Sequence, residues 1–446
     1  MGRKSHGQAL SIWANGERIG TWHIPARGAP YLQYERAWMA SDLGRPLSLS
    51  LPFGVDDTPL KGERVLNYFD NLLPDSREIR ARIAGRFRTG SVEPFELLKA
   101  AGRDCVGAIQ LLDVDEAPAN VRSIEASPLS DQDVERMLQQ AVAPSIAGEA
   151  LDEDDFRLSI AGAQEKTALL RHKGRWLRPH GSTPTTHILK LPLGLVGHRR
   201  IDLGTSVENE WLCAKVLEEF GLPVAETEIC DFGRTRVLCV TRFDRRMSAD
   251  GKWYLRLPQE DMCQARGLSP LLKYEQDGGP GMEAIAQVLR GSEAAPSDLT
   301  TFLAAQMLFW LLAAPDGHAK NFSLQLQARG LYRMTPLYDV MSIWPAVGDG
   351  PNQFNWHRAK LAMSVKGRNR HYLLKDIQRR HFNAMAPRCF YGESAEPLVQ
   401  TIIERTPGVI DRVNARLPLG FPQRVADGIL HGLRNAVDAM AAMPVR

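Results

Sequence analysis

The stretch LAAPDGHAKNFSL, residues 312–324, places an aspartate, a histidine, a lysine and an asparagine within positions 316–321. It continues the apolar run 302–314, which is too short to cross a bilayer because a membrane helix needs about 20 apolar residues. We therefore expect that run to form a buried helix that ends near the polar residues. A solvated loop needs polar residues but not this combination, so the stretch predicts a chemical site beside a core helix.

The spacing of Asp316 and Asn321, D-x-x-x-x-N, is that of the protein-kinase catalytic loop, where the aspartate orients the attacking hydroxyl and the asparagine holds magnesium. Alone the spacing is weak evidence, because a chain of this length contains on the order of one such match by chance, and a solvated loop would explain it. Asp339 follows beyond two strand-like segments and a turn, where kinases place the aspartate that chelates magnesium. A buried carboxylate is costly without a partner, so a metal ion or backbone N–H groups would compensate Asp339.

A lysine and a glutamate precede this region in the order that kinases use. Lys190 lies in the strand-like segment HILKLP (187–192), and it needs an anionic partner unless its ammonium reaches solvent at a sheet edge. Glu210 shares an apolar stripe of the next helix with Val207 and Leu217, although solvent could satisfy it at the helix flank. Together, Lys190 and Glu210 match the kinase pair that positions phosphates.

Two further segments have kinase counterparts. In SIAGAQEKT (159–167), Gly162 lies between small residues and lets backbone N–H groups approach an anion. The segment is neither G-x-G-x-x-G nor a Walker A sequence, and Ser159 could simply cap a turn. Residues 241–243 leave a buried strand just before the helical region, where a kinase hinge offers main-chain groups to adenine.

The composition is that of an ordinary soluble globular protein, with 44% hydrophobic and 24% charged residues. A net charge of +3 permits contact with nucleic acid without requiring it. The six cysteines form no C-x-x-C pair, which disfavours a zinc ribbon or a disulfide framework. The segment MGRKSHGQ lacks the apolar core of a signal peptide. We therefore expect a cytoplasmic protein with reduced thiols and no membrane contact.

The first part of the chain mixes strand-like and helical segments. Residues 9–112 include a hairpin at the Asn-Gly turn 15–16, an expected strand at 46–52 and a helical segment at 75–87. An acidic stretch rich in Pro, Ala and Ser, 113–129, then predicts a boundary.

A strand-rich region follows, with a hairpin at Gly174 and a helix that stops at Gly221, and helices dominate the remainder. We predict an α+β, two-lobed protein-kinase-like fold. Its expected parts are an N-terminal α/β subdomain (1–125), a nucleotide-binding small lobe (126–255) and a helical catalytic lobe (256–446).

Seven segments carry a family resemblance: SIAGAQEKTALL, PTTHILKLP, VTRFDRR, RLPQEDMCQA, DGGPG, APDGHAKNFSL and TPLYDVMS. They resemble the HipA family of bacterial toxin–antitoxin kinases, and the similarity extends over about residues 10–440. The resemblance implies a phosphatidylinositol-kinase-like fold and serine/threonine kinase activity with ATP and Mg²⁺. It also implies a complex with a small helix-turn-helix antitoxin, HipB, on operator DNA, and hence association with the nucleoid. The expected protein substrate is an aminoacyl-tRNA synthetase, glutamyl-tRNA synthetase in the best-known case.

The resemblance also implies residue roles, with Asp316 as catalytic base and Asn321 and Asp339 as magnesium ligands. Ser159 would be autophosphorylated, and Glu210 would support Lys190. The expected nucleotide-binding residues are Ala161, Gly162, Ala163, Gln164, Glu165 and Lys166 in the phosphate loop, Lys190, Thr241, Arg242 and Phe243 in the hinge, and His318, Lys320, Asn321, Tyr338 and Asp339. The chain departs from the family pattern at Pro315, which precedes the aspartate. Relative to ordinary protein kinases it lacks the arginine of H-R-D, so activation-loop control through that arginine is not expected.

Three functions compete. The first is an active kinase toxin, the second a catalytically dispensable corepressor that stabilises the antitoxin on DNA, and the third a small-molecule kinase. The complete set of kinase residues favours the first, and a DNA role can coexist with it through the basic segments KGRNRH (366–371) and QRRH (378–381), which could equally be solvated faces. Phosphorylation of Ser159 would add charge beside the nucleotide phosphates. We expect it to withdraw the loop, toward Arg157 or Arg245, and to inactivate the protein.

Overall fold

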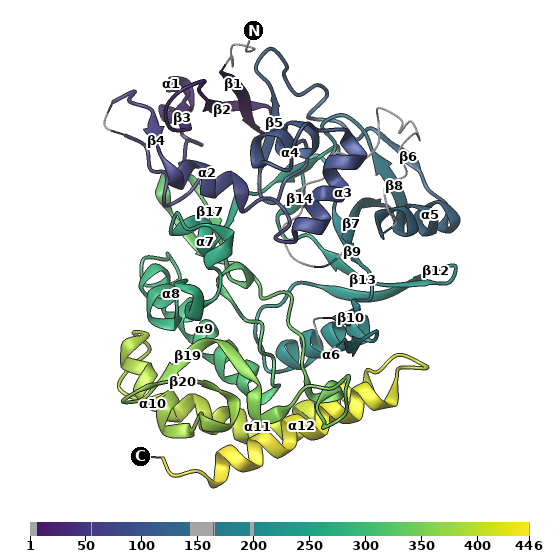
Figure 1. Cartoon of the computed structure of the whole chain (residues 1–446), viewed down its shortest axis with the longest axis vertical. Coiled ribbons are helices and arrows are strands. Elements are labelled where there is room, and N and C mark those ends of the chain that lie inside the picture. The colour runs from purple at the N-terminus through teal and green to yellow at the C-terminus, as the bar shows by residue number, and fades with distance from the viewer. Residues whose placement is uncertain (1–6, 55, 143–163, 165, 197–199, 446) are drawn as a thin grey trace.

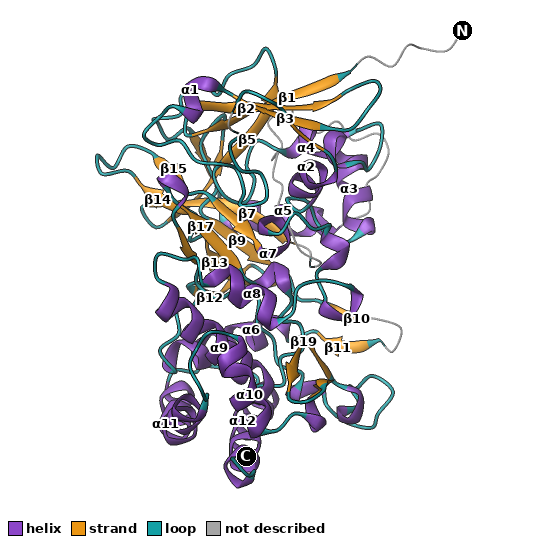
Figure 2. Ribbon diagram, turned by 90° about the vertical axis from the view of Figure 1, so that its left-hand side faces the viewer, coloured by secondary structure: helices purple, strands orange, loops and turns teal. Residues whose placement is uncertain are grey.

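The computed structural model describes residues 7–54, 56–142, 164, 166–196 and 200–445. Three parts follow one another along the long axis, with the N-terminal strands at one end and the C-terminal helices at the other (Figure 1). In the view turned by 90°, strands fill the upper and central parts and helices fill most of the lower part (Figure 2). The predicted order of mixed segments before a helical lobe is present, and the boundaries at residues 125 and 255 stay predictions.

An antiparallel sheet in the order β4-β3-β2-β1-β5 forms the N-terminal part. Its elements are β1 (Gln8–Ala14), β2 (Glu17–Ile24), β3 (Tyr31–Tyr34), β4 (Leu60–Lys61), β5 (Ile109–Asp113), α1 (Arg36–Met39), α2 (Glu63–Asp70), α3 (Arg77–Phe87) and α4 (Pro94–Ala101). The predicted hairpin is confirmed, because Asn15 and Gly16 have φ angles of 51° and 89° between β1 and β2. Trp22 is fully buried and stacks on Phe69, with ring centroids 4.0 Å apart, in a core that belongs to this part.

The expected strand at 46–52 is wrong, because these residues form turns and bends. Ser50 Oγ donates to Gln264 O at 2.6 Å, and Leu49 N donates to Glu260 Oε1 at 2.9 Å. The alternating Leu and Ser residues suggested strand pairing, but their polar groups instead bind a segment more than 200 positions away in the chain.

The central part is a six-stranded sheet in the order β12-β13-β9-β7-β8-β6. Its elements are β6 (Ala126–Pro128), β7 (Lys166–His172), β8 (Arg175–Pro179), β9 (His187–Lys190), β12 (Thr227–Phe232) and β13 (Thr235–Thr241), with α5 (Asp131–Val142) and α6 (Ser206–Glu219) packed against it. Two small hairpins pair β10 (Gly194–Val196) with β11 (Ile201–Leu203) and β14 (Arg245–Met247) with β15 (Tyr254–Arg256). The predicted turn between β7 and β8 is confirmed, because Lys173 and Gly174 have φ angles of 50° and 75°.

The last part is mainly helical. Its elements are β16 (Gln259–Asp261), β17 (Ser323–Leu326), β18 (Tyr332–Met334), β19 (Lys360–Lys366), β20 (Arg370–Leu373), α7 (Met262–Ala265), α8 (Met282–Leu289), α9 (Ala295–Leu311), α10 (Arg379–Arg388), α11 (Glu396–Ala415) and α12 (Gln423–Ala442). The short 3-10 helices used below are η1 (Pro270–Leu272), η2 (Glu275–Asp277) and η3 (Ala319–Asn321). Among the described residues, none of the helices combines the length and apolarity that a membrane span requires.

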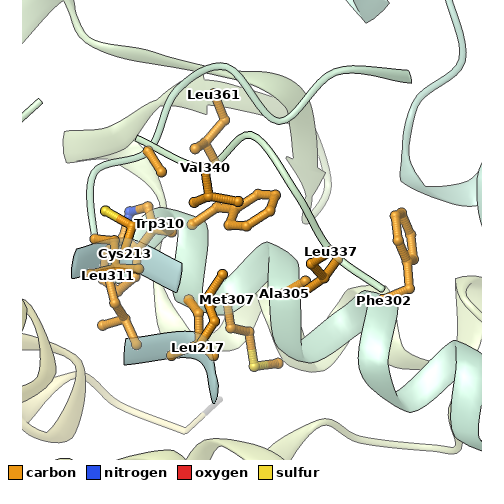
Figure 3. Packing of buried hydrophobic residues seen from close by; sticks show 14 of the residues in the cluster. Cys213, Leu217, Phe302, Ala305, Met307, Trp310, Leu311, Leu337, Val340 and Leu361 are labelled. Atoms are coloured by element: carbon orange, nitrogen blue, oxygen red, sulfur yellow. The ribbon is translucent and has the colours of Figure 1, made fainter. Parts of the chain in front are cut away.

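The apolar run of the sequence forms the second half of α9, and residues 302–311 are all buried, as predicted. Met307 lies near Leu217 of α6, and Leu337 and Val340 belong to the same buried cluster (Figure 3). Leu337 and Val340 flank Asp339 in the chain. The core therefore fixes both the end of α9, where the polar stretch begins, and the segment that carries Asp339.

A buried group of charges, here called the junction cluster, joins the first two parts. Its members are Asp104, Arg242, Asp244, Arg245 and Arg256, all of them buried. Asp104 accepts hydrogen bonds from Arg245 Nη2 at 2.9 Å and from Arg256 Nη1, and Asp244 lies 2.8 Å from Arg242 Nη2. Since Arg242 directly follows β13, the junction cluster ties the predicted hinge to the N-terminal part.

Candidate functional site

All of the predicted site residues that the structure describes, except Glu210, line a cavity of about 470 Å³. Its walls include the inner strands of the central sheet, the polar stretch after α9, and residues 71–75 after α2. Lys190, Asp316, Asn321 and Asp339 all line it. Residues that are far apart in the sequence are thus brought to one hollow at the junction of the three parts.

The polar stretch turns sharply after α9. Ala313 has a φ angle of 46°, and Ala314 N donates to Phe309 O at 2.7 Å, so the helix ends within two residues. The chain then presents Asp316 with an exposed side chain at the cavity and winds through η3 into β17. A carboxylate that is open to solvent on a fixed loop is suited to receive a proton from an incoming hydroxyl.

Asp339 and Asn321, the predicted metal ligands, are in contact. Asn321 Nδ2 donates to Asp339 Oδ2 at 3.2 Å, while Asn321 Oδ1 is buried and has no hydrogen-bond partner among the described residues. Asp339 has a φ angle of 63°, a left-handed conformation that costs free energy and is typical of functional sites. Carboxylate and amide oxygens are the ligands that Mg²⁺ prefers. The orphaned amide oxygen and the oxygen donors therefore fit a magnesium ion.

Lys190 lies between two carboxylates. Its Nζ donates to Glu210 Oε1 and to Asp339 Oδ1, each at 2.6 Å. Burial by itself would lower the pKa of Lys190, but Asp339 and Glu210 outweigh burial and raise it. Although burial opposes ionisation of Asp339, Lys190 and Lys166 hold the pKa of Asp339 well below its ordinary value. The predicted Lys–Glu pair is present as an ion pair, and its contact with phosphates stays a prediction.

A second lysine faces Lys190. Lys166 is its direct partner in the pairing of β7 with β9, so the two side chains leave the sheet on the same face. Burial, and next the charge of Lys190, lower the pKa of Lys166 to about 8. Two ammonium groups opposite each other repel, and such a pair at a cavity wall is suited to bind an anion with several oxygens, such as a polyphosphate.

Lys320 and His318 both line the cavity, and their roles at the phosphates stay predictions. Lys320 Nζ donates to Asn71 Oδ1 and Asp261 Oδ2, each at 2.8 Å, so its ammonium already holds the N-terminal part against the last part. His318 is buried, and its Nδ1 has no hydrogen-bond partner among the described residues. Burial, together with the nearby Lys273, lowers the pKa of His318 to about 3, so the imidazole is neutral at physiological pH.

The predicted hinge, residues 241–243, has fewer unbonded main-chain N–H groups than expected. The N–H groups of Thr241 and Arg242 already donate to backbone oxygens, each at 2.9 Å, and the Arg242 guanidinium belongs to the junction cluster. The ring of Phe243 packs against Tyr338 with centroids 5.7 Å apart, and both residues line the cavity. Phe243 and Tyr338 are therefore better placed than Arg242 to contact a base.

The phosphate loop falls largely outside the described residues. Ser159, Ala161, Gly162, Ala163 and Glu165 are among those not described, as is Arg157. Gln164 is described, and its Nε2 donates to Leu191 O at the cavity wall.

The other expected receptor of a phosphoserine, Arg245, is not available. Its Nη1 donates to Gly107 O at 2.8 Å, and its Nη2 donates to Asp104 Oδ1 and Cys105 O. The expectation that Arg245 receives a displaced phosphate is therefore wrong, because the junction cluster and nearby backbone oxygens already bind its guanidinium.

Two groups at the site were missed by the sequence reading. Asp75 lines the cavity and pairs with Lys273 at 2.8 Å, while its Oδ1 has no hydrogen-bond partner among the described residues. No sequence signal pointed to it, since Asp75 precedes a helix and reads as part of a cap. Tyr274 donates its hydroxyl to Asp316 Oδ1 at 2.6 Å. The glycine-rich segment that follows, 278–281, was the available sign of a closely packed loop.

Comparison with protein-family models gives two matches. Residues 158–411 match the HipA-like C-terminal domain, and residues 10–112 match the HipA N-terminal domain. Over 345 residues the chain is 33% identical to the putative kinase Y4mE of Sinorhizobium fredii, covering 75% of this chain and 77% of the relative. Over 327 residues it is 28% identical to the serine/threonine-protein kinase toxin HipA of Shewanella oneidensis, covering 70% of each chain.

Among solved structures, the chain is similar to that of HipA in its complex with HipB and operator DNA from Shewanella oneidensis MR-1. The TM-score is 0.78 at 23% sequence identity, and 97% of each chain is covered. The predicted α+β, two-lobed kinase-like fold is confirmed by this similarity.

Proposed function

Because this chain belongs to the HipA family of serine/threonine kinases, we propose that its cavity binds ATP with Mg²⁺ and that Asp316 directs phosphoryl transfer to a serine or threonine hydroxyl. The observation that carries the proposal is the convergence of Lys190, Asn321 and Asp339 at one cavity, with Glu210 paired to Lys190 and Asp316 exposed on the cavity wall. A vestigial site would have no need to keep these charges together against their cost of burial.

The roles follow from the contacts. Lys190 and Lys166 bind phosphate oxygens, with phosphate taking the place of Asp339 as one acceptor of Lys190. Asp339 and Asn321 Oδ1, which has no hydrogen-bond partner in the described part of the chain, hold the metal ion, which when bound neutralises phosphate charge. Phe243 and Tyr338 contact the base. Asp316 orients the protein hydroxyl and receives its proton.

The biological role that we propose is that of a toxin restrained by a HipB-like helix-turn-helix antitoxin, with the pair acting on operator DNA. The solved complex of the relative supports both partners. Autophosphorylation of Ser159 and inhibition of translation through an aminoacyl-tRNA synthetase, in particular glutamyl-tRNA synthetase, remain part of the proposal on the family resemblance alone.

A basic hollow favours the coexisting role on DNA. It is about 650 Å³ in volume and lies between the hairpin β19–β20 and the start of α10. Arg368, Lys375 and Arg380 line it, and the rings of His371 and His381 stack there at 4.0 Å. Both predicted basic segments contribute cationic side chains to this hollow, and such side chains are suited to binding the backbone phosphates of DNA.

The test is transfer of labelled phosphate from ATP with Mg²⁺ by the purified chain. Asp316→Gln should reduce the rate by about 10²- to 10⁴-fold, the usual contribution of a general base. Its fold should survive, since the side chain is exposed. Asp339→Asn should also abolish transfer, through loss of the metal ligand. The matched control is Asp427→Asn on α12, where an exposed aspartate accepts from Gln423 at 2.8 Å.

The same variant separates the kinase from a catalytically dispensable corepressor. A reporter gene behind the operator, repressed by antitoxin with either wild type or Asp316→Gln, measures the DNA role, and growth arrest measures toxicity. An active toxin loses growth arrest in Asp316→Gln. If Asp316→Gln arrests growth as wild type does, phosphoryl transfer is not the source of toxicity.

A further inference from the structure

We propose that Tyr274 is a positioning residue for Asp316: its hydroxyl holds one carboxylate oxygen, fixes the ionised form, and leaves the other oxygen to the substrate hydroxyl. The inference rests on the proposed kinase function and adds to it a residue that the kinase comparison did not supply. It begins from one contact, in which Tyr274 Oη donates to Asp316 Oδ1 at 2.6 Å. Such a bond to an ionised carboxylate is among the stronger hydrogen bonds in proteins.

The tyrosine is held from several sides. Its ring meets that of His318 edge-on with centroids 5.0 Å apart, and the backbone of the preceding residue is tied to the polar stretch, since Ala319 N donates to Lys273 O at 3.1 Å. On its other side, Glu275 accepts from Ser364 N at 2.6 Å and from Ser364 Oγ at 3.1 Å. The hydroxyl is therefore brought to Asp316 by a fixed loop.

The glycines after Tyr274 explain why the loop closes so tightly. A Cβ on Gly279 would lie 2.0 Å from Leu272 O and 2.7 Å from Tyr274 O. The chain thus folds back on itself immediately beside the tyrosine, and Lys273 Nζ binds Asp75 Oδ2 at 2.8 Å across to the N-terminal part. This explains the quoted segment DGGPG, to which the kinase comparison gave no role.

The charged groups around Asp316 act on its pKa in opposite directions. Although the Asp316 side chain reaches solvent, the surrounding cavity walls partly desolvate it. This desolvation, and next the negative charge of Asp339, raise the pKa of Asp316, whereas the hydrogen bond from Tyr274 lowers it. Lys273 on the tyrosine loop also lowers it, and Asp75 from the N-terminal part raises it. His318 on the polar stretch is neutral near pH 7. Removing the phenol hydroxyl therefore removes a group that keeps Asp316 ionised.

The phenol itself does not titrate in the working range. Burial and the charge of Asp316 raise the pKa of Tyr274 above its ordinary value, so it remains a donor. A hydroxyl that donates to Oδ1 also restricts rotation of the carboxylate. Oδ2 is then the oxygen that can meet the hydroxyl of the substrate.

The experiment measures phosphate transfer from ATP with Mg²⁺ to a library of serine- and threonine-containing peptides between pH 5 and 9. In Tyr274→Phe, the acid limb of kcat should move to higher pH by about one to two units, the shift that loss of a hydrogen bond to a charged group produces. KM for ATP should stay unchanged, because Tyr274 does not line the nucleotide cavity. Phenylalanine keeps the ring against His318, so the fold is preserved.

The control is Tyr332→Phe. It removes a hydroxyl that donates to Val288 O at 2.8 Å, and Tyr332 does not line the cavity. It should keep the acid limb of wild type. The inference is overturned if the acid limb of the Tyr274→Phe profile lies at the same pH as that of wild type. Faster transfer with a lower KM for peptide also overturns it, because the phenol would then obstruct the substrate hydroxyl.

A measurement without turnover separates this inference from the kinase proposal. The carboxyl carbon of Asp316 is assigned by NMR of ¹³C-aspartate-labelled protein against Asp316→Asn, and its titration is followed in wild type and Tyr274→Phe. A higher pKa in Tyr274→Phe supports the inference even for a chain that transfers no phosphate, and equal pKa values refute it. Failure of the kinase proposal shows instead as absence of Asp316-dependent transfer in wild type.

Discussion

Replacing Asp104 by asparagine should destabilise the protein more than any comparable change at its surface. Asp104 accepts hydrogen bonds from Arg245 and Arg256 on one oxygen, and from Arg242 Nη1 at 3.3 Å and Thr185 Oγ1 at 2.6 Å on the other. The junction cluster holds three guanidinium groups and two carboxylates. Asp104→Asn keeps the shape but leaves three buried positive charges with one carboxylate.

The magnitude follows from that charge count. Breaking a buried ion pair by removing one partner costs about 3–5 kcal/mol. At about 1 °C per kcal/mol for a chain of 446 residues, the melting temperature should fall by roughly 3–5 °C. Because Arg242 directly follows β13, the stabilisation of the protein by ATP with Mg²⁺ should also weaken.

The pH dependence gives a second criterion. Burial would raise the pKa of Asp104, but Arg256, Arg245 and Arg242 outweigh it and hold the pKa far below its ordinary value. A depressed carboxyl pKa gives stability that is present above the unfolded-state pKa, about 3.9, and is lost only as pH falls toward the folded-state value. The difference in melting temperature between wild type and Asp104→Asn should therefore stay constant from pH 5 to 8.

The assay is thermal unfolding followed by circular dichroism and calorimetry. The control is Asp113→Asn in the same part of the protein, where a largely exposed carboxylate lies 3.0 Å from Lys99 and should contribute about 0–1 kcal/mol. The reasoning is refuted if Asp104→Asn and Asp113→Asn lower the melting temperature equally, since a buried charge cluster would then contribute no more than a surface pair.

Two further predictions use the site and its supports. Lys190→Ala should greatly reduce the rise in melting temperature that ATP with Mg²⁺ produces, because ligand stabilises only the state that binds it; an unchanged rise would remove Lys190 from the site. Glu260 is fully buried, and burial raises its pKa to about 8, so its folded form favours the neutral acid and wild type loses stability as pH rises from about 4.5 to 8. Glu260→Gln should therefore gain stability relative to wild type over that interval and level off above it, and a pH-independent difference between their melting curves would contradict the raised pKa.

The sequence by itself determined the features that depend on local spacing. The Asn15–Gly16 hairpin and the buried second half of α9 follow from turn chemistry and from an apolar run, and both are confirmed. The residues Lys190, Asp316 and Asp339 were identified because their order and spacing match a chemical requirement, and the structure brings them to one cavity. Their catalytic roles stay predictions.

Only the tertiary structure decided which groups those residues meet. Lys320 was expected at phosphates, yet it binds Asn71, 249 positions earlier in the chain. The segment 46–52 alternates like a strand, yet its polar groups bind residues beyond position 258. Tyr274 reaches Asp316 because the glycine-rich loop lies against the polar stretch. Periodicity and spacing report only on neighbours along the chain, whereas the partner of a buried charge is set by how separately folded parts pack, and the free energy of that packing depends on contacts that no short window of sequence contains.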